Sequence, residues 1–219
     1  MLEGPDVQLP LLLYPRVLFP CTELRVALDG ALLHDLLLTA PDERWLGVVL
    51  ALPRGGEAAS GIYPAGTASR VLELEPEGVG CRVRLLGTHR FRMAGSPDAE
   101  PYPRAFVHLM PEPVLDESAP ALVRLRRDLE EKLGEARRLL GKALPLGSDQ
   151  LERLAEAPFE ELVNRAAMAL DVPELRQLEL LTLPLPDRAL EITGILRSRI
   201  KLMALLGPYR HLAAGAEVN

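Results

Sequence analysis

The sequence changes its hydrophobic period once, near Pro113, and this change limits the folds that the chain can adopt. Before it, apolar residues form short continuous or alternating runs, which are typical of β-strands. After it, apolar residues recur every three or four positions, which is typical of amphipathic helices. Strands followed by helices favour the α+β class with two domains, which we place at residues 1–115 and 116–219.

The runs in the first half have the lengths and flanking residues of β-strands. WLGVVLAL, residues 45–52, is almost wholly apolar, as expected for a strand that is buried on both faces. Two further runs flank turn residues Gly78 and Gly80 and therefore predict a β-hairpin. One segment, residues 30–39, has a helical pattern instead. The predicted strands are residues 45–52, 67–74, 81–86 and 104–110.

The apolar opening segment, residues 9–26, cannot form one continuous helix, because Pro10, Pro15 and Pro20 interrupt it. Proline in a sheet is confined to an edge, a strand start or a bulge. We therefore expect a strand, a kinked crossing and a second strand that close a small β-barrel. Generic core strands would account for the hydrophobicity equally well.

The same segment raises the question of export or membrane insertion. No lysine or arginine precedes Leu9, although a secretory signal begins with basic residues. Arg16 and the prolines also keep the apolar run below the ~20 residues that span a bilayer. We therefore expect a soluble, cytoplasmic protein without a membrane partner.

The second half has the capping residues and apolar spacing of a helical bundle. Asp116 or Ser118 is predicted to cap the first long helix, which runs to about Leu140, and Ser148 to cap the next helix. Proline is predicted as the first helical residue of the two helices that follow. The predicted helices are residues 118–140, 148–157, 158–170, 173–181 and 186–207.

Short motifs occur along the chain in a recognisable order. An LP…V-x-FP opening precedes the first predicted helix, a GTA strand follows, and a later strand ends in G-x-x-R-F. The residues that carry these motifs are Leu9, Pro10, Val17, Phe19, Pro20, Gly66, Thr67, Ala68, Gly87, Arg90 and Phe91. Their order resembles the N-terminal substrate-recognition domain of Lon proteases. The helical half continues the resemblance, which covers residues 7–206.

Two segments depart from the pattern of that family. PCTELRV, residues 20–26, lacks the glycine and the second proline that usually stand there, with Cys21 directly after the first proline. ALDGA, residues 27–31, replaces an acidic-Pro-Arg-aromatic segment. Contacts that this loop makes in relatives are therefore not carried over.

The resemblance implies a fold and a role. The fold is a β-barrel of the pseudouridine-synthase-associated (PUA-like) type, followed by an α-helical bundle. The role is to hold protein substrates rather than to cut them. Full-length Lon proteases add an ATPase module and a Ser–Lys peptidase module, so the expectation here is a stand-alone module that lacks both.

No motif in the sequence has the pattern of a catalytic site. Residues 134–143 (GEARRLLGKA) place six residues between glycines where a P-loop has four, and alanine replaces its serine or threonine. Ser198 and Lys201 have S-x-x-K spacing, but the S-D-N and K-T-G motifs that accompany it are absent. The histidines, Cys21 and Cys81 follow no metal-ligand spacing. We therefore predict a non-enzyme without catalytic residues, cofactors or metal.

Arginines gather on the predicted hairpin of an otherwise acidic chain, whose net charge is −6. Arg82 and Arg84 alternate with apolar residues and so point off the core face, and Arg90 lies beside a phenylalanine in the same way. Such a patch would attract acidic polypeptide segments, or RNA as in some PUA folds. A solvated outer face that also bears Glu73 and Glu75 is the more ordinary interpretation.

Large apolar residues near predicted loops and strand ends form a second candidate surface, because recognition of unfolded protein requires exposed apolar area. A core position is the more ordinary interpretation of each. The location that we expect for the ligand is the groove where the strand domain meets the helical domain, since domain junctions favour concavity. The apolar candidates are Tyr14, Leu18, Trp45 and Tyr63.

The leading hypothesis is a non-catalytic module that binds unfolded or degron-bearing polypeptides, as an adaptor or holder. A separate protease and a weak homo-oligomer stay open as further partners. The alternative is an RNA- or small-ligand-binding PUA-like protein, although the acidic net charge and the few aromatics disfavour nucleic acid. A third hypothesis is the recognition piece of a longer protease.

Overall fold

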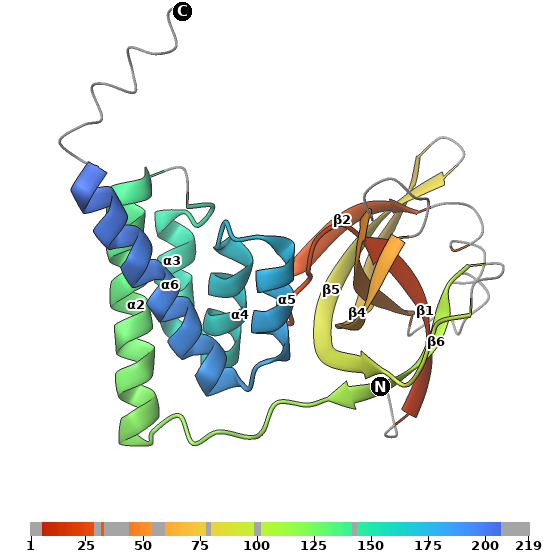
Figure 1. Ribbon diagram of the computed structural model, residues 1–219, viewed down its shortest axis with the longest axis horizontal. Coiled ribbons are helices and arrows are strands. Elements are labelled where there is room, and N and C mark those ends of the chain that lie inside the picture. Colours follow the sequence, from red (N-terminus) through yellow and green to blue (C-terminus); the bar gives the residue numbers. More distant parts are fainter. Residues whose placement is uncertain are drawn as a thin grey trace, which may run out of the picture. The chain divides into compact units, whose positions relative to one another are not determined.

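The protein forms two compact units in the computed structural model (Figure 1). The structure describes residues 6–28, 32, 44–53, 60–77, 80–98, 102–141 and 144–206. The first unit comprises the described residues up to Pro113 together with Val172–Leu183. The second comprises Val114–Asp171 and the described residues from Pro184 onward.

The described part of the first unit contains a six-stranded sheet. Its strands are β1 (Asp6–Tyr14), β2 (Glu23–Leu28), β3 (Trp45–Pro53), β4 (Ser60–Glu77), β5 (Gly80–Met93) and β6 (Arg104–Met110). Their order is β2-β5-β4-β3-β1-β6, and β6 also pairs with β5, so the hydrogen-bonded order returns to β5. All four predicted strands are confirmed, although β4 and β5 are longer than predicted. A closed barrel stays a prediction.

The central strand β3 has buried apolar side chains on both of its faces. Val48 belongs to one buried cluster and its neighbour Val49 to another, because successive residues of a strand point to opposite faces. Phe91, fully buried, lies in the cluster of Val49, and Val83 lies in the cluster of Val48. The prediction that residues 45–52 form a strand buried on both faces is therefore confirmed.

The opening segment crosses between β1 and β2 as the prolines predict, and its backbone is anchored at Gly87 of β5. The Gly87 N–H donates to the Thr22 carbonyl, and the Gly87 carbonyl accepts from the Cys21 N–H, both at 2.9 Å. A Cβ at Gly87 would lie 2.4 Å from the carbonyl oxygen of Phe19, so only glycine fits there. The Thr67 hydroxyl also donates to the Leu18 carbonyl at 2.6 Å. Residues of the GTA and G-x-x-R-F motifs thus hold the crossing in place.

Cys21 adopts a left-handed backbone conformation in this crossing, with φ 60°. This conformation costs residues other than glycine about 1–2 kcal/mol. Glycine avoids that cost, but it loses about 0.5–1 kcal/mol of folding free energy because its unfolded chain has more conformational freedom. We expect Cys21→Gly to raise the free energy of unfolding by about 0.5–1 kcal/mol. Denaturant unfolding followed by the fluorescence of Trp45, the single tryptophan, measures this. Cys21→Ala is the control, and equal stability of the two variants would contradict the explanation.

The helices resemble the predicted ones in position but differ at their ends. They are α2 (Pro120–Leu140), α3 (Ser148–Glu156), α4 (Phe159–Ala169), α5 (Glu174–Thr182) and α6 (Leu185–Leu206). Of the predicted helix at residues 30–39, the structure describes only Leu32, which is buried. No helix in the described part of the chain has both the length and the apolar character to cross a membrane.

The predicted helix caps are wrong. The N-cap of α2 is Ala119, without a side-chain cap, because Asp116 and Ser118 bond to each other instead. Ser148 is the first residue of α3 rather than its cap, and the Gln150 side chain accepts the Gly147 N–H at 2.8 Å. The prolines that precede α4 and α5 are N-caps rather than first helical residues.

Most helices form the second unit, but α5 belongs to the first. Within the second unit α2 packs along α6, and α4 contacts α6 as well. Arg188 of α6 is fully buried and donates a hydrogen bond to the side-chain oxygen of Asn164 in α4. The helical period alone does not distinguish α5 from these helices, whereas the contacts group it with the strands.

Candidate functional site

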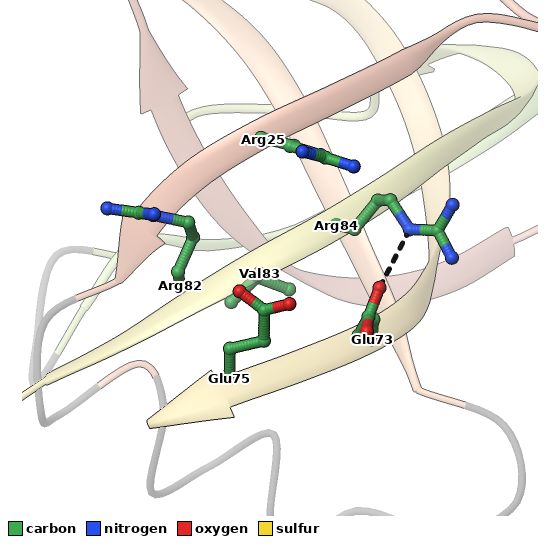
Figure 2. Close-up of a pocket in the computed structure, with 6 residues that line it drawn as sticks. All are labelled: Arg25, Glu73, Glu75, Arg82, Val83 and Arg84. Carbon is green, nitrogen blue, oxygen red and sulfur yellow. Dashed lines mark ion pairs between the residues drawn. The ribbon is translucent and has the colours of Figure 1, made fainter. Parts of the chain in front are cut away.

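The predicted basic patch lies on a face where positive and negative charges alternate (Figure 2). Arg84 Nε lies 3.1 Å from Glu73, and its Nη1 lies 3.5 Å from Glu23. Arg82 stands opposite Glu75 in the β4–β5 register. The hollow between these side chains measures about 10 Å³, which is room for no more than one water molecule. Its lining residues are Arg25, Glu73, Glu75, Arg82, Val83 and Arg84.

The formal charges of this face cancel once Glu23 is included. Arg25, Arg82 and Arg84 face three glutamates, so the face carries no net positive charge. Nucleic-acid sites combine positive charge with aromatic platforms. The mixed face therefore has the character of the solvated outer face that the sequence also allowed.

Arg90 lies inside the first unit rather than on its surface. Its side chain is 6% exposed and its Nε lies 2.8 Å from Glu112, whose side chain is 8% exposed. Its Nη1 donates to the carbonyls of Leu181 and Leu183 at 2.9 and 2.8 Å. Arg90 points to the opposite side of β5 from the core residue Phe91, as predicted, but the expectation that it belongs to a surface patch is wrong. This residue ties β5 to the end of α5 and to the segment after β6.

The four apolar candidates do not form one surface, although Tyr14 packs against the buried cluster that contains Leu18. Leu18 is buried in the core, with 2% exposure. Tyr14 and Trp45 are half-buried and pack against different clusters. Tyr63 is half-buried in β4. The Trp45 ring tilts against the ring of His89, with 6.5 Å between centroids.

A groove lies among three helices of the second unit. It measures about 260 Å³ and is lined by Glu130, Leu133, Gly134, Leu151, Glu152, Ala155 and Leu162. The first three residues come from α2, the next three from α3 and the last from α4. Leu133 and Leu162 also line the groove, and each has only 1% of its surface exposed.

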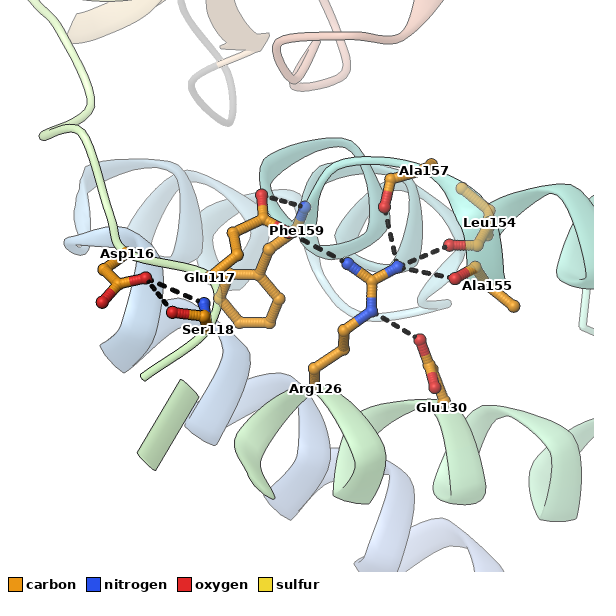
Figure 3. Close-up of polar contacts among 9 residues, drawn as sticks. All are labelled: Asp116, Glu117, Ser118, Arg126, Glu130, Leu154, Ala155, Ala157 and Phe159. Carbon is orange, nitrogen blue, oxygen red and sulfur yellow. Dashed lines mark hydrogen bonds and ion pairs between the residues drawn. The ribbon is translucent and has the colours of Figure 1, made fainter. Parts of the chain in front are cut away.

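Arg126 of α2 joins the helices that border the groove (Figure 3). Its Nη2 donates to the carbonyls of Ala155 and Ala157 at 2.8 and 2.7 Å, and to that of Leu154 at 3.4 Å. These carbonyls belong to the C-terminal end of α3, where helical carbonyls lack partners and a positive charge is favourable. The Arg126 Nε donates to Glu130 at 2.8 Å. Arg126 thus fixes the end of α3 against α2.

Glu117 extends this arrangement to α4. One carboxylate oxygen accepts the backbone N–H of Phe159, the first residue of α4, at 3.0 Å. The other lies 3.3 Å from Arg126 Nη1. An anion at a helix N-terminus satisfies a free N–H and interacts favourably with the helix dipole. The segment before α2 therefore caps α4, which lies far along the chain.

Asp116 and Ser118 form a tight turn just before α2 (Figure 3). The Ser118 hydroxyl and its backbone N–H both donate to the Asp116 carboxylate, at 2.6 and 3.0 Å. These two hydrogen bonds, the side-chain one first, lower the pKa of Asp116 below its ordinary value. The turn is consequently formed at neutral pH and weakens as pH falls through that lowered pKa.

The motifs that resemble catalytic ones have ordinary surroundings. Ser198 is exposed on α6, and its hydroxyl donates to the Gly194 carbonyl at 3.0 Å, within the same helix. Lys201 is exposed as well. Within the described ranges, no three or more histidine, cysteine, aspartate or glutamate side chains are grouped to hold a metal ion.

Comparison with known proteins finds similar solved structures. No family model matches the sequence, and no curated protein matches it. The N-terminal domain of the Lon protease of the Mycobacterium avium complex is similar, with TM-score 0.60, 16% identity and coverage of 87% of this chain and 98% of that one. A Lon N-terminal domain protein from Xanthomonas campestris gives TM-score 0.57 and 24% identity, over 84% and 95%. The fold is that of the Lon N-terminal domain.

The Lon N-terminal fold gives the recognised motif residues structural roles. Gly87 and Thr67 hold the opening crossing, Phe91 fills the core, and Arg90 joins β5 to α5. Their spacing in the sequence was therefore a signal of fold rather than of a binding surface.

The groove and the Arg126 contacts were missed in the sequence. The only local signal was Arg126 and Glu130 at i,i+4 spacing, a common arrangement on any helix surface. In the sequence, Gly134 belongs to residues 134–143, which do not fit the P-loop pattern. Three helices must come together before it lines a groove.

Proposed function

We propose that this protein is a non-catalytic polypeptide-binding module of the cytoplasm, which holds unfolded or degron-bearing proteins as an adaptor or holder. The observation that carries the proposal is the Lon N-terminal fold, which extends over both units of the chain. In this proposal the strand unit is a PUA-like barrel. The return of the strand order from β6 to β5 supports that assignment.

The described surface also supports a polypeptide ligand over a nucleic acid. Leu202, Leu205 and Leu206 at the end of α6 are exposed, and Leu205 has 72% of its surface in solvent. Exposed apolar area of this kind suits the apolar segments of unfolded chains. Arg25, Arg82 and Arg84 of the strand unit, in contrast, share their face with glutamates.

Binding of an unfolded protein tests the proposal. Fluorescein-labelled lysozyme, reduced and alkylated so that it stays unfolded, should bind with a Kd near or above about 1 μM. Raising the salt concentration should change this Kd only a few-fold, because apolar contacts resist salt whereas phosphate contacts release counterions. Fluorescence anisotropy over a salt series measures both quantities.

The arginine face provides the control for this experiment. Arg82→Glu/Arg84→Glu should leave binding of the unfolded protein nearly unchanged. The proposal fails if a single-stranded RNA is instead the tightest ligand, with an affinity that collapses as salt rises and disappears in the double variant. The RNA-binding alternative would then hold.

A further inference from the structure

The groove of the helical unit has the size of an apolar side chain rather than of a cofactor. Its volume of about 260 Å³ exceeds the ~150 Å³ of an apolar cavity that holds benzene. It is smaller than the ~300–1,000 Å³ of ordinary small-molecule pockets. Leu133, Leu151 and Leu162 supply apolar walls, and Gly134 leaves space above α2. One or two aliphatic side chains would fill it.

The charged groups at the groove are acidic. Among the residues that the structure describes, the charged ones that line it are Glu130 and Glu152, and none is a lysine or arginine. Glu130 is engaged by Arg126, whereas Glu152 is exposed and forms no ion pair with another described residue. Asp149 and Glu156 flank Glu152 at i−3 and i+4 on α3, and both are exposed.

The acidic edge leaves α3 with a net negative charge. Its nine residues contain three acids and a single base, Arg153. A binding segment would therefore gain from positive charge next to the side chain that enters the groove.

We propose that the groove between α2, α3 and α4 binds a large aliphatic side chain of a polypeptide segment in which lysine or arginine lies beside that side chain. The inference rests on the proposed polypeptide-binding function and names the class of segment that is bound. The aliphatic side chain contacts Leu133, Leu151 and Leu162, and its basic neighbour contacts the edge at Glu152.

The groove is formed before any ligand arrives. Arg126 holds the carbonyl of Ala155 in α3, which lines the groove, and it also holds Glu130, one turn further along its own helix α2. Because these contacts fix α3 against α2, binding does not require the helices to move. Arg126 is a positioning residue in this arrangement and does not touch the bound segment.

Gly134 allows the groove to be filled without disturbing the fold. A Cβ at this position would meet no heavy atom within 4 Å. Gly194 of α6 has the same open surroundings and does not line the groove, so it is a matched control. Leucine at either position is more favourable in a helix than glycine by roughly 0.8 kcal/mol, so both variants should fold.

The probe is a short fluorescein-labelled peptide with two adjacent leucines, flanked on each side by lysine, in a glycine–serine background. Gly134→Leu should weaken its binding at least about tenfold, because the burial of a leucine side chain is lost. Gly194→Leu should leave its Kd unchanged. Equal Kd values for both variants and the unaltered protein would overturn the groove assignment.

A reversal of charge tests the basic neighbour. Glu152→Lys should weaken the lysine-flanked peptide about threefold and strengthen a glutamate-flanked version by a similar factor. Glu131→Lys, at an exposed position of α2 outside the groove lining, should change neither peptide in this way. Parallel changes for both peptides in Glu152→Lys would contradict the proposed charge preference.

The unfolded lysozyme separates this inference from the function on which it rests. If lysozyme binds while the peptide Kd is unaffected by Gly134→Leu, the groove assignment is wrong and the polypeptide-binding function stands. If the unaltered protein binds neither lysozyme nor the peptide, the proposed function itself fails. If Gly134→Leu loses peptide binding and Gly194→Leu does not, the groove assignment and the polypeptide-binding function are both supported.

Discussion

Arg126→Met is expected to lower the free energy of unfolding by about 3 kcal/mol. The substitution leaves the carbonyls of Ala155 and Ala157 without their donor and removes the positive charge from the end of α3. Hydrogen bonds to charged groups contribute about 1.5–3 kcal/mol each, and losses that share one side chain do not add fully. Denaturant unfolding followed by far-UV circular dichroism measures the change.

Arg127→Met is the matched control, because Arg127 is the next residue of α2 and is exposed. A loss below about 0.5 kcal/mol is expected there, as at most surface positions. Arg126→Lys should lie between the two, since a lysine ammonium keeps the charge but lacks the fork of donors that reaches several carbonyls. If Arg126→Met is no less stable than Arg127→Met, Arg126 does not join the helices as described.

Arg90→Met is expected to destabilise the protein by about 3–5 kcal/mol, as is usual when one partner of a buried ion pair is removed. The substitution leaves the Glu112 carboxylate buried beside an apolar side chain, and it leaves the carbonyls of Leu181 and Leu183 without this donor. Trp45 lies in β3 of the same unit, so its fluorescence reports the unfolding.

The double variant Arg90→Met/Glu112→Leu separates the two causes. Without a buried carboxylate it should recover part of the lost stability, because a buried ion pair can be replaced by apolar side chains at little cost. The remaining deficit, about 1–3 kcal/mol, would come from the two carbonyls. The loss of stability in the double variant is compared with the losses in Arg90→Met and Glu112→Leu. If it equals their sum, Arg90 and Glu112 do not interact.

Local pattern predicted the elements well where one residue type dominates a segment. The predicted strands WLGVVLAL and RAFVHLM agree almost residue for residue with β3 and β6. Apolar residues predominate in both runs, and short apolar runs are typical of strands. The ends of β4 and β5 were predicted too short. The missed parts contain Pro64, Gly66 and Gly87, residue types that a local pattern does not favour inside a strand.

Helix ends were harder to predict than helices. Asp116 and Ser118 are good capping residues, yet they bond to each other, and Glu117 between them caps a different helix. When several hydrogen-bond partners lie within reach of a side chain, the three-dimensional geometry decides which one it bonds. The amino-acid sequence does not specify that geometry directly. The candidate site was missed for the same reason, since its lining comes from three helices.

The amino-acid sequence by itself determined the α+β class, the order of strands and helices, and the crossing at the prolines. These features depend on periodicity and on the fixed φ angle of proline, which act within a few residues. Only the tertiary structure decided where the charges lie. Arg90 is buried because Leu181, 91 residues away in the chain, presents its carbonyl there, whereas Arg84 stays at the surface among glutamates. The environment of a side chain is set by whichever elements fold against it, and those elements are distant in sequence.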